Sequence, residues 1–287
     1  MFVSSWVLNA DMWEYQVRFF RSHGYRCILP DRRGHGRSDR PPNGYDLDTR
    51  ADDLAALIDH LDLRDITLVA DSAGGGEVAR YLARHGEQRA ARVGFLAATL
   101  PFLKLTEDNP DGLPEAACEA AVTQFCTDRP KYFADRAPGY FATHLGNDVS
   151  PALIDNELQR CLSASPMATI EVWRENFHAD HRATTAPVLI IHGVADQSAP
   201  IDVTGRRTAK LVPGCVYKEY PTLTKTHVQK SRGASITETG VAHQDQFARD
   251  PPRPPTTAGQ PYCRCSIDDF GVPRSETRRN RQLGSGG

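Results

Sequence analysis

Residues 65–80 read Asp-Ile-Thr-Leu-Val-Ala-Asp-Ser-Ala-Gly-Gly-Gly-Glu-Val-Ala-Arg, and this stretch decides the fold. Its first half, 65–71, is an aliphatic run without polar-apolar alternation, which is typical of a strand buried on both faces of a parallel sheet. A Gly-rich turn then leads directly into the amphipathic segment 74–85, which predicts a helix. A buried strand followed at once by a helix indicates one unit of an α/β fold.

The alternation of strands and helices continues on both sides of this stretch. We expect helices at 48–61 and 201–211 and further strands at 26–31, 92–99, 186–192 and 215–220. This order predicts a mostly parallel sheet with helices on both faces.

Segment 101–181 interrupts the alternation with irregular helical stretches, and we expect a helical insertion there. Its aromatic side chains either line an apolar pocket or form the core of the insertion, and the sequence leaves both open. They include Phe102, Phe125, Tyr132, Phe133, Tyr140, Phe141, Trp173 and Phe177.

The composition is that of an ordinary globular protein. The 287 residues suit one large domain, and 34 Lys+Arg against 36 Asp+Glu give a net charge of -2. We therefore expect no nucleic-acid partner. No apolar run reaches the roughly 18 residues of a membrane span, and the start lacks the basic region of a secretory signal, so we expect no membrane partner and a cytoplasmic location.

Cysteine spacing gives no sign of a disulfide framework or a metal site. The seven cysteines are an odd number, and most are scattered. Cys263 and Cys265 form a C-x-C pair without a second pair nearby, so we expect no metal. The segment 228–287 is rich in Pro and Arg with no sustained apolar period, which predicts a disordered tail.

Ser72 stands where the strand turns into the helix. Small residues surround it, Ala70 before and Gly74 after, as in a nucleophile elbow, where the serine backbone is strained and larger neighbours would collide. The alternative is a Gly-rich turn in which Ser72 only caps the helix. A phosphate-binding loop is set aside, because neither Gly-x-x-x-x-Gly-Lys-Ser/Thr nor Gly-x-Gly-x-x-Gly occurs here.

A serine nucleophile needs an acid and a histidine, which follow in that order in such folds. Asp196 comes just after the expected strand 186–192, at the same sheet edge as the elbow, and is the candidate acid. The alternative for Asp196 is a solvated turn aspartate.

Several motifs in chain order resemble the cofactor-free (non-haem) chloroperoxidase and aryl esterase branch of the α/β-hydrolase superfamily, and the likeness runs from about Trp6 to Tyr220. They are Trp6 with 8–16, Gly24-Tyr-Arg, 31–39 (Asp-Arg-Arg-Gly-His-Gly-Arg-Ser-Asp), Ala51-Asp-Asp-Leu, His60-Leu-Asp-Leu, the elbow with 75–81, and 192–197 (His-Gly-Val-Ala-Asp-Gln).

The resemblance implies an α/β-hydrolase fold with a core at 1–100 and 182–227, a helical cap at 101–181 and a non-family tail at 228–287. It implies that small, often aryl, esters are cleaved through an acyl-enzyme on Ser72, with Asp196 orienting the base. The backbone N–H groups of Trp6 and Ala73 would hold the oxyanion. With hydrogen peroxide in place of water, such enzymes form peracids that oxidise halide. No cofactor is expected.

Three departures from the family pattern stand out. The chain begins where the family has its third strand, so we expect the N-terminal strands to be missing, and Ser4-Ser5 replaces the family's His-Gly before Trp6.

The second departure is Asp71, which directly precedes Ser72. It suggests a haloalkane-dehalogenase hypothesis in which Asp71 is the nucleophile. We discount this hypothesis because Ser72 occupies the elbow tip.

The third departure concerns the base. The family places its histidine 29 residues after the acid, where this chain has Lys225. His227 is the nearest substitute and our candidate base, ahead of His243 in the tail. The alternative function is a catalytically impaired or non-catalytic remnant of a hydrolase. His35 and the pair Arg37 and Asp39 are expected to brace the turn after 26–31 through charge-assisted hydrogen bonds.

Overall fold

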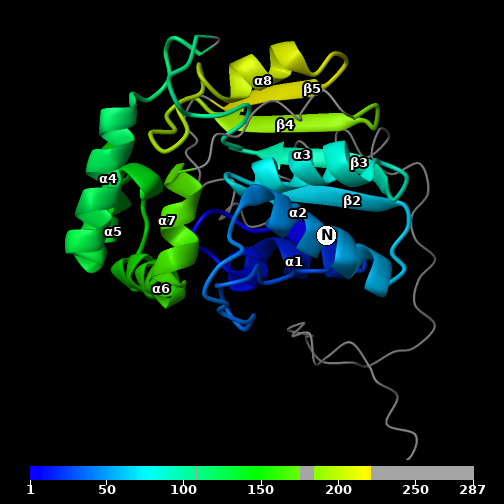
Figure 1. The fold of residues 1–287 in the computed structure, drawn as a ribbon, viewed down its shortest axis with the longest axis horizontal. Coiled ribbons are helices and arrows are strands. Elements are labelled where there is room, and N and C mark those ends of the chain that lie inside the picture. Colours follow the sequence, from blue (N-terminus) through cyan, green and yellow to red (C-terminus); the bar gives the residue numbers. More distant parts are fainter. Residues whose placement is uncertain (108, 175–183, 221–287) are drawn as a thin grey trace, which may run out of the picture.

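The computed structural model describes residues 1–107, 109–174 and 184–220, and this part is built on a five-stranded parallel sheet (Figure 1). The strands lie side by side in chain order, and every neighbouring pair is parallel. All carboxyl ends therefore meet at one edge of the sheet. The strands are β1 (Phe2–Val3), β2 (Ile66–Asp71), β3 (Ala90–Leu96), β4 (Val188–Gly193) and β5 (Val216–Tyr220).

Successive strand residues enter two hydrophobic cores on opposite faces of the sheet. Leu68 and Ile190 pack with α2, α3 and α8, whereas Val69 and Ile191 pack with α1 and the 3-10 helix η1. Both faces are covered, so the strands show no polar alternation, and the expected sheet with helices on both faces is confirmed. These helices are η1 (Ala10–Trp13), α1 (Glu14–Ser22), α2 (Leu47–His60), α3 (Gly74–His85) and α8 (Gly205–Leu211).

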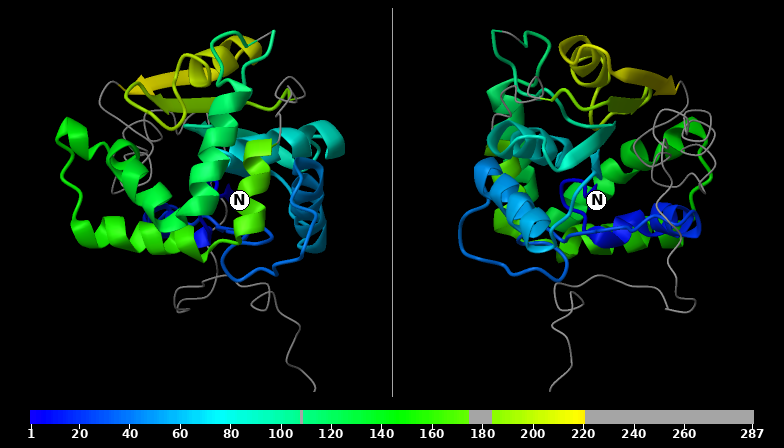
Figure 2. Two further views of the ribbon diagram at one scale, coloured as in Figure 1. Left: turned by 60° about the vertical axis from the view of Figure 1, so that its left-hand side comes forward. Right: turned by 90° about the vertical axis from the view of Figure 1, so that its right-hand side faces the viewer.

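Within the described residues, four further helices gather at one side of the sheet (Figures 1 and 2). Local signals start two of them: Asp128 caps α5 by accepting from the N–H of Lys131 (2.9 Å), and Ser150 caps α6 by accepting from that of Leu153 (3.3 Å). The helices expected between 101 and 181 are thus present in the described part of that segment, 101–107 and 109–174. They are α4 (Glu115–Thr127), α5 (Arg129–Phe141), α6 (Pro151–Ser163) and α7 (Pro166–Arg174), with the 3-10 turn η2 (Thr143–Leu145) between α5 and α6.

The expected strand at 26–31 is wrong. The segment runs beside β1, and the N–H of Phe2 donates to the carbonyl oxygen of Ile28 (2.8 Å), but it has no strand assignment. β1 offers only two residues for pairing, and Pro30 has no N–H to donate. Segment 26–31 therefore lacks the run of backbone partners that a strand needs.

One helix boundary differs from the expectation, and two helical elements are additional to it. Helix α8 begins at Gly205 rather than at 201, because residues 201–204 form turns in which the Thr204 hydroxyl donates to the carbonyl oxygen of Pro200 (2.8 Å). Helix α1 and η1 were not expected at all, and Asn9 starts η1 by accepting from the N–H of Asp11 (3.0 Å).

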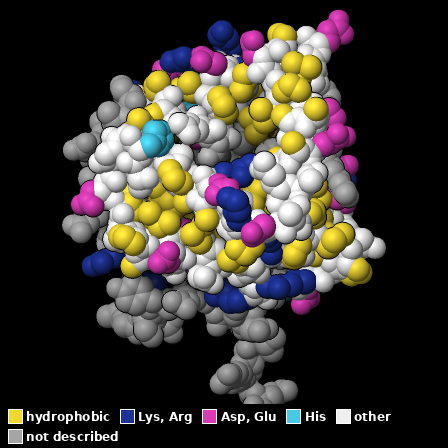
Figure 3. All heavy atoms as spheres, turned by 90° about the vertical axis from the view of Figure 1, so that its left-hand side faces the viewer, with side chains coloured by type: hydrophobic (Ala, Val, Ile, Leu, Met, Phe, Trp, Pro, Cys, Tyr) yellow, Lys and Arg dark blue, Asp and Glu magenta, His cyan; other side chains and the backbone are white. Residues whose placement is uncertain are grey.

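The cysteines, the surface and the helix lengths can be compared with the expectations for the described residues. Five cysteines lie in this part of the chain, and all are free thiols. Seen from the side that carries α4–α7, hydrophobic side chains are interspersed with charges of both signs (Figure 3). No helix in the described ranges is both long and apolar enough to cross a membrane. The expected tail at 228–287, with Cys263 and Cys265, lies outside the described residues.

Candidate active site

Ser72 occupies a strained turn between β2 and α3. Its φ is +53°, in the left-handed region that residues other than glycine rarely adopt. Three backbone hydrogen bonds hold it there: its N–H donates to the Leu96 carbonyl oxygen (3.1 Å), and its own carbonyl oxygen accepts from Gly75 (3.0 Å) and Thr99 (3.2 Å). A strand that passes through such a turn into a helix is the geometry expected for a nucleophile elbow. Ser72 does not cap the helix, because the N-cap residue of α3 is Ala73.

The small residues around Ser72 are required by close approach of other segments. A Cβ on Gly74 would stand 2.7 Å from the carbonyl oxygen of Ser4 and 2.8 Å from that of Val3. A Cβ on Gly75 would stand 2.7 Å from the Cβ of Ala98. The backbone that follows β1 therefore lies directly against the first turn of α3.

This backbone carries Trp6, the first expected oxyanion donor, while Ala73, the second, directly follows Ser72 and is buried. Ser4 and Ser5 are both buried, and the Ser4 hydroxyl accepts from the indole N–H of Trp13 (3.2 Å). The Trp6 indole N–H donates to the Thr169 carbonyl oxygen on α7 (2.9 Å). The loop at Ser4-Ser5, where this chain departs from the family pattern, is thus held by Trp13 on one side and by α7 on the other.

Asp196 follows β4, so it shares the carboxyl edge of the sheet with Ser72, and β3 lies between their strands. Its side chain is buried, and Oδ1 accepts from the N–H groups of Ser198 (2.7 Å) and Ala199 (2.9 Å). No described residue donates a hydrogen bond to Oδ2. Asp196 is therefore not a solvated turn residue: one oxygen anchors its loop, and the other is able to accept from an imidazole.

His192 lies close to Asp196 but is bound elsewhere. Its Nε2 donates to the Ala199 carbonyl oxygen (2.8 Å) and is 3.7 Å from Asp196 Oδ2. The ring is fully buried against Gly205. His192 thus supports the Asp196 loop. The candidate base, His227, and its alternative His243 lie outside the described residues.

Asp71 is fully buried at the end of β2, before the elbow tip. The residue in the left-handed conformation at the tip of the turn is Ser72, not Asp71.

The turn after 26–31 supports the loop that carries Trp6. His35 is buried with Nε2 3.1 Å from the Trp6 carbonyl oxygen and Nδ1 3.0 Å from that of Arg33. The pKa of His35 is lowered to about 3, mainly because the ring is buried and secondly because the positive charge of Arg32 is near it. His35 thus braces this turn as expected, but as a neutral ring and not through charge-assisted hydrogen bonds.

The other two residues of that turn act differently from the expectation. Arg37 does not pair with Asp39: its Nε lies 3.0 Å from Asp31 Oδ2, and Asp39 contributes its carbonyl oxygen to the N–H of Gly34 (2.8 Å). Asp31 also accepts from the N–H of Ala10 (2.7 Å), so it is the better placed partner.

The aromatic residues of α4 and α5 are core rather than an open pocket lining. Phe125, Tyr132 and Phe133 are buried and pack edge to face among themselves, with ring centroids 5.5–5.8 Å apart. All three also contact the Trp6 ring at 6.1–6.2 Å. Trp173 and Phe177 do not bear on this, because the Trp173 side chain and residue 177 are not described.

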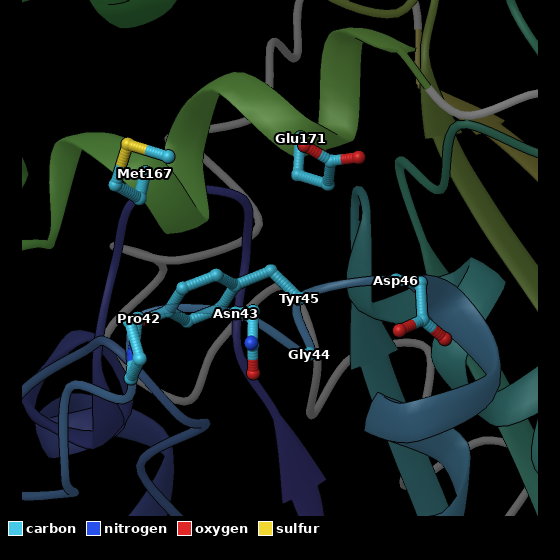
Figure 4. Close-up of a pocket in the computed structure, with 7 residues that line it drawn as sticks. All are labelled: Pro42, Asn43, Gly44, Tyr45, Asp46, Met167 and Glu171. Atoms are coloured by element: carbon cyan, nitrogen blue, oxygen red, sulfur yellow. The ribbon is translucent and has the colours of Figure 1, made fainter.

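A hollow of about 210 Å³ lies between the 42–46 loop and α7 (Figure 4). Asp46 and Glu171 line it, together with Tyr45 and Met167, but neither Ser72 nor Asp196 does. Within the described ranges, no group of three or more His, Cys, Asp or Glu side chains is arranged to hold a metal ion.

Sequence reasoning missed a buried ion cluster beneath the Trp6 loop. Glu77 on α3 lies between Arg32 (2.8 Å) and Arg50 (3.1 Å). The available signal was a charged residue, Glu77, on the helix face that otherwise carries Gly74, Val78 and Tyr81.

Known proteins resemble this chain in fold and in sequence. The family described as alpha/beta hydrolase fold matches residues 1–222. A non-haem chloroperoxidase of Kitasatospora aureofaciens is 39% identical over 77% of this chain and 82% of its own. A bifunctional esterase/perhydrolase of Acinetobacter calcoaceticus is 33% identical over the same shares of the two chains. The crystal structure of a bromoperoxidase from Bacillus anthracis superposes with a TM-score of 0.79 at 32% identity, covering 87% of this chain and 91% of that one.

Proposed function

Because the chain belongs to the α/β-hydrolase fold family, we propose that it is a serine hydrolase that cleaves small carboxylic esters, aryl esters among them, through an acyl-enzyme. One observation carries the proposal. Ser72 is held at φ +53° at the carboxyl end of β2, directly beside the loop that carries Trp6. Strain of this kind places the serine oxygen at the tip of the turn, where a substrate carbonyl reaches it.

In the proposed mechanism, Ser72 Oγ attacks the ester carbonyl while His227 takes its proton. Asp196 Oδ2 accepts from the imidazole and stabilises its charged form. The N–H groups of Trp6 and Ala73 hold the oxyanion, the alcohol leaves with the proton from His227, and water releases the acid. The buried Asp196 oxygen that accepts no hydrogen bond from the described residues supports this assignment.

The same acyl-enzyme explains a perhydrolase activity. Hydrogen peroxide attacks the acyl carbon in place of water, gives its proton to the base and leaves as a peracid, while Ser72 is regenerated. The O–O bond of the peracid then breaks as its outer oxygen passes to halide, which is oxidised to hypohalite while the peracid is reduced to the carboxylic acid. The names of the two relatives, chloroperoxidase and esterase/perhydrolase, support this second outcome.

We further propose that residues 1–100 and 182–227 form the catalytic core and 101–181 a cap over it. Contacts of Trp6 with Phe125 on α4 and with Thr169 on α7 support the cap, because these helices then border the proposed oxyanion loop. The proposed substrate is a small cytoplasmic molecule.

Hydrolysis of phenyl acetate tests the function. We expect Ser72→Ala to abolish turnover and Asp196→Asn to reduce kcat on the order of 10⁴-fold. His227→Gln should reduce kcat similarly, and His243→Gln should not.

One rival function, that of a non-catalytic remnant of a hydrolase, is favoured by Lys225, which stands at the family's histidine position. Folded wild-type protein that is no faster than Ser72→Ala would establish that rival.

A further inference from the structure

A buried arginine connects the loop after β1 with the helix after Ser72. Nη1 of Arg32 donates to the carbonyl oxygens of Ser5 (2.8 Å) and Trp6 (3.0 Å), and Nη2 donates to that of Ser4. Nε of Arg32 lies 2.8 Å from Oε1 of Glu77, in the first turn of α3. One guanidinium thus contacts three consecutive carbonyl groups of the loop and the helix that begins at the elbow.

The local charges make Arg32 depend on the loop carbonyl groups. Arg50 Nη1 also lies 3.1 Å from Glu77 Oε1, and the side chains of Arg32, Arg50 and Glu77 are only 9%, 3% and 4% exposed. Two buried cations therefore share one carboxylate. Buried charge is costly unless dipoles or counter-charges surround it, and the three loop carbonyls supply that negative potential to Arg32.

Because the peptide bond is planar, the hydrogen bond from Arg32 to the Ser5 carbonyl oxygen also sets the direction of the Trp6 N–H. The Ser5 carbonyl and the Trp6 N–H belong to one trans peptide group, so they point to opposite sides of the chain. Because Arg32 holds the Ser5 oxygen, it also fixes where the Trp6 N–H points. The same loop lies against Gly74, two residues after Ser72.

We propose that Arg32 is a positioning residue that aims the Trp6 N–H at the oxyanion formed on Ser72, with Glu77 tying this geometry to the nucleophile helix. The inference rests on the proposed function, since it gives Trp6 a role in ester cleavage. It adds to that function a dependence on a side chain that does not touch the substrate.

Arg32→Lys tests the proposal, because an ammonium keeps the charge but lacks the planar fork that spans several acceptors. Arg33→Lys is the matched control: Arg33 is the next residue, and its guanidinium binds Asp53 and the Gly44 carbonyl oxygen instead. Two readouts are compared after a thermal melt has shown that each variant is folded. They are amide hydrogen exchange at residues 4–9, and kcat and KM for phenyl acetate and its thionoester.

In Arg32→Lys we expect exchange at 4–9 to be at least roughly tenfold faster and kcat to fall about 10- to 100-fold, less than the full loss of an oxyanion donor. KM should change less than about threefold, because the contact acts on the transition state. The ester-to-thionoester rate ratio should fall, since sulfur accepts hydrogen bonds poorly. Arg33→Lys should match the wild type in every readout. If Arg32→Lys does not fold, Glu77→Gln is measured with the same readouts and should shift them in the same directions.

Unchanged exchange at 4–9 in a folded Arg32→Lys, or in Glu77→Gln where the first variant is unfolded, overturns the proposal whether or not the protein cleaves esters. Faster exchange with an unchanged ester-to-thionoester ratio also overturns it, because Arg32 would then be merely structural. Faster exchange in a protein whose wild type has no Ser72-dependent turnover overturns the proposed function and leaves only the structural coupling of Arg32 to the loop.

Discussion

Single residues at the elbow decide whether two segments of backbone can meet. A Cβ on Gly74 meets the carbonyl oxygens of Ser4 and Val3, which are backbone atoms and cannot rotate away. We expect Gly74→Ala to destabilise the fold by about 1–3 kcal/mol and to push the Trp6 loop away from Ser72, so that kcat falls. Urea unfolding and phenyl acetate turnover measure both effects.

Gly94→Ala is the control for this change, because a Cβ there has its nearest neighbours at an ordinary 3.9 Å. It should alter stability and kcat far less than Gly74→Ala. Equal effects of the two substitutions would show that the close approach to Ser4 and Val3 has no special importance.

At the scale of elements, the rings of α4 and α5 secure the Trp6 loop. Phe125→Leu keeps most of the volume but removes edge-to-face contacts with Tyr132 and Phe133 and the contact with Trp6. We expect a loss of about 1–2 kcal/mol in the free energy of unfolding, measured in urea. Phe19→Leu, in α1 on a half-buried ring, is the control and should cost less. A loss in Phe125→Leu no larger than in the control would argue against a shared core.

Sequence reasoning worked where the signal is local. The apolar spacing of α2 and α3 and the turn around Ser72 depend on residues close in sequence, and those predictions are confirmed within one residue. It failed where a partner decides the outcome. The segment 26–31 has the composition of a strand, but β1 is too short to pair with it.

The candidate site divides in the same way. Ser72 and Asp196 follow strands that could be recognised from the sequence, so their shared sheet edge was predictable. The apolar face of α3 marks Glu77 as a buried charge, but its contact with Arg32 joins residues 45 positions apart, so no local pattern identifies the partner.

At the scale of the whole molecule, the buried His35 makes stability depend on pH. Its pKa is lowered from 6.5 to about 3 in the folded chain, so the unfolded chain takes up a proton at a higher pH. Its contribution to stability is therefore complete above about pH 6.5 and is lost as the pH falls towards 3. Between pH 7 and pH 5 we expect a loss of about 2 kcal/mol from this residue.

Urea unfolding of the wild type and of His35→Gln at both pH values isolates this contribution, because the other titrating groups are common to the two proteins. The difference in stability between them should shrink by that amount on acidification. A difference that does not change with pH would mean that His35 is not kept neutral by burial.

The central claim is that Ser72 is an activated nucleophile, and labelling with a fluorophosphonate probe tests it most directly. Such a probe bonds only to a serine that a working base and oxyanion hole activate. We expect one adduct per molecule, mapped by mass spectrometry to Ser72 and lost in Ser72→Ala. Folded wild-type protein that takes no label, or a label that persists in Ser72→Ala, would contradict the account.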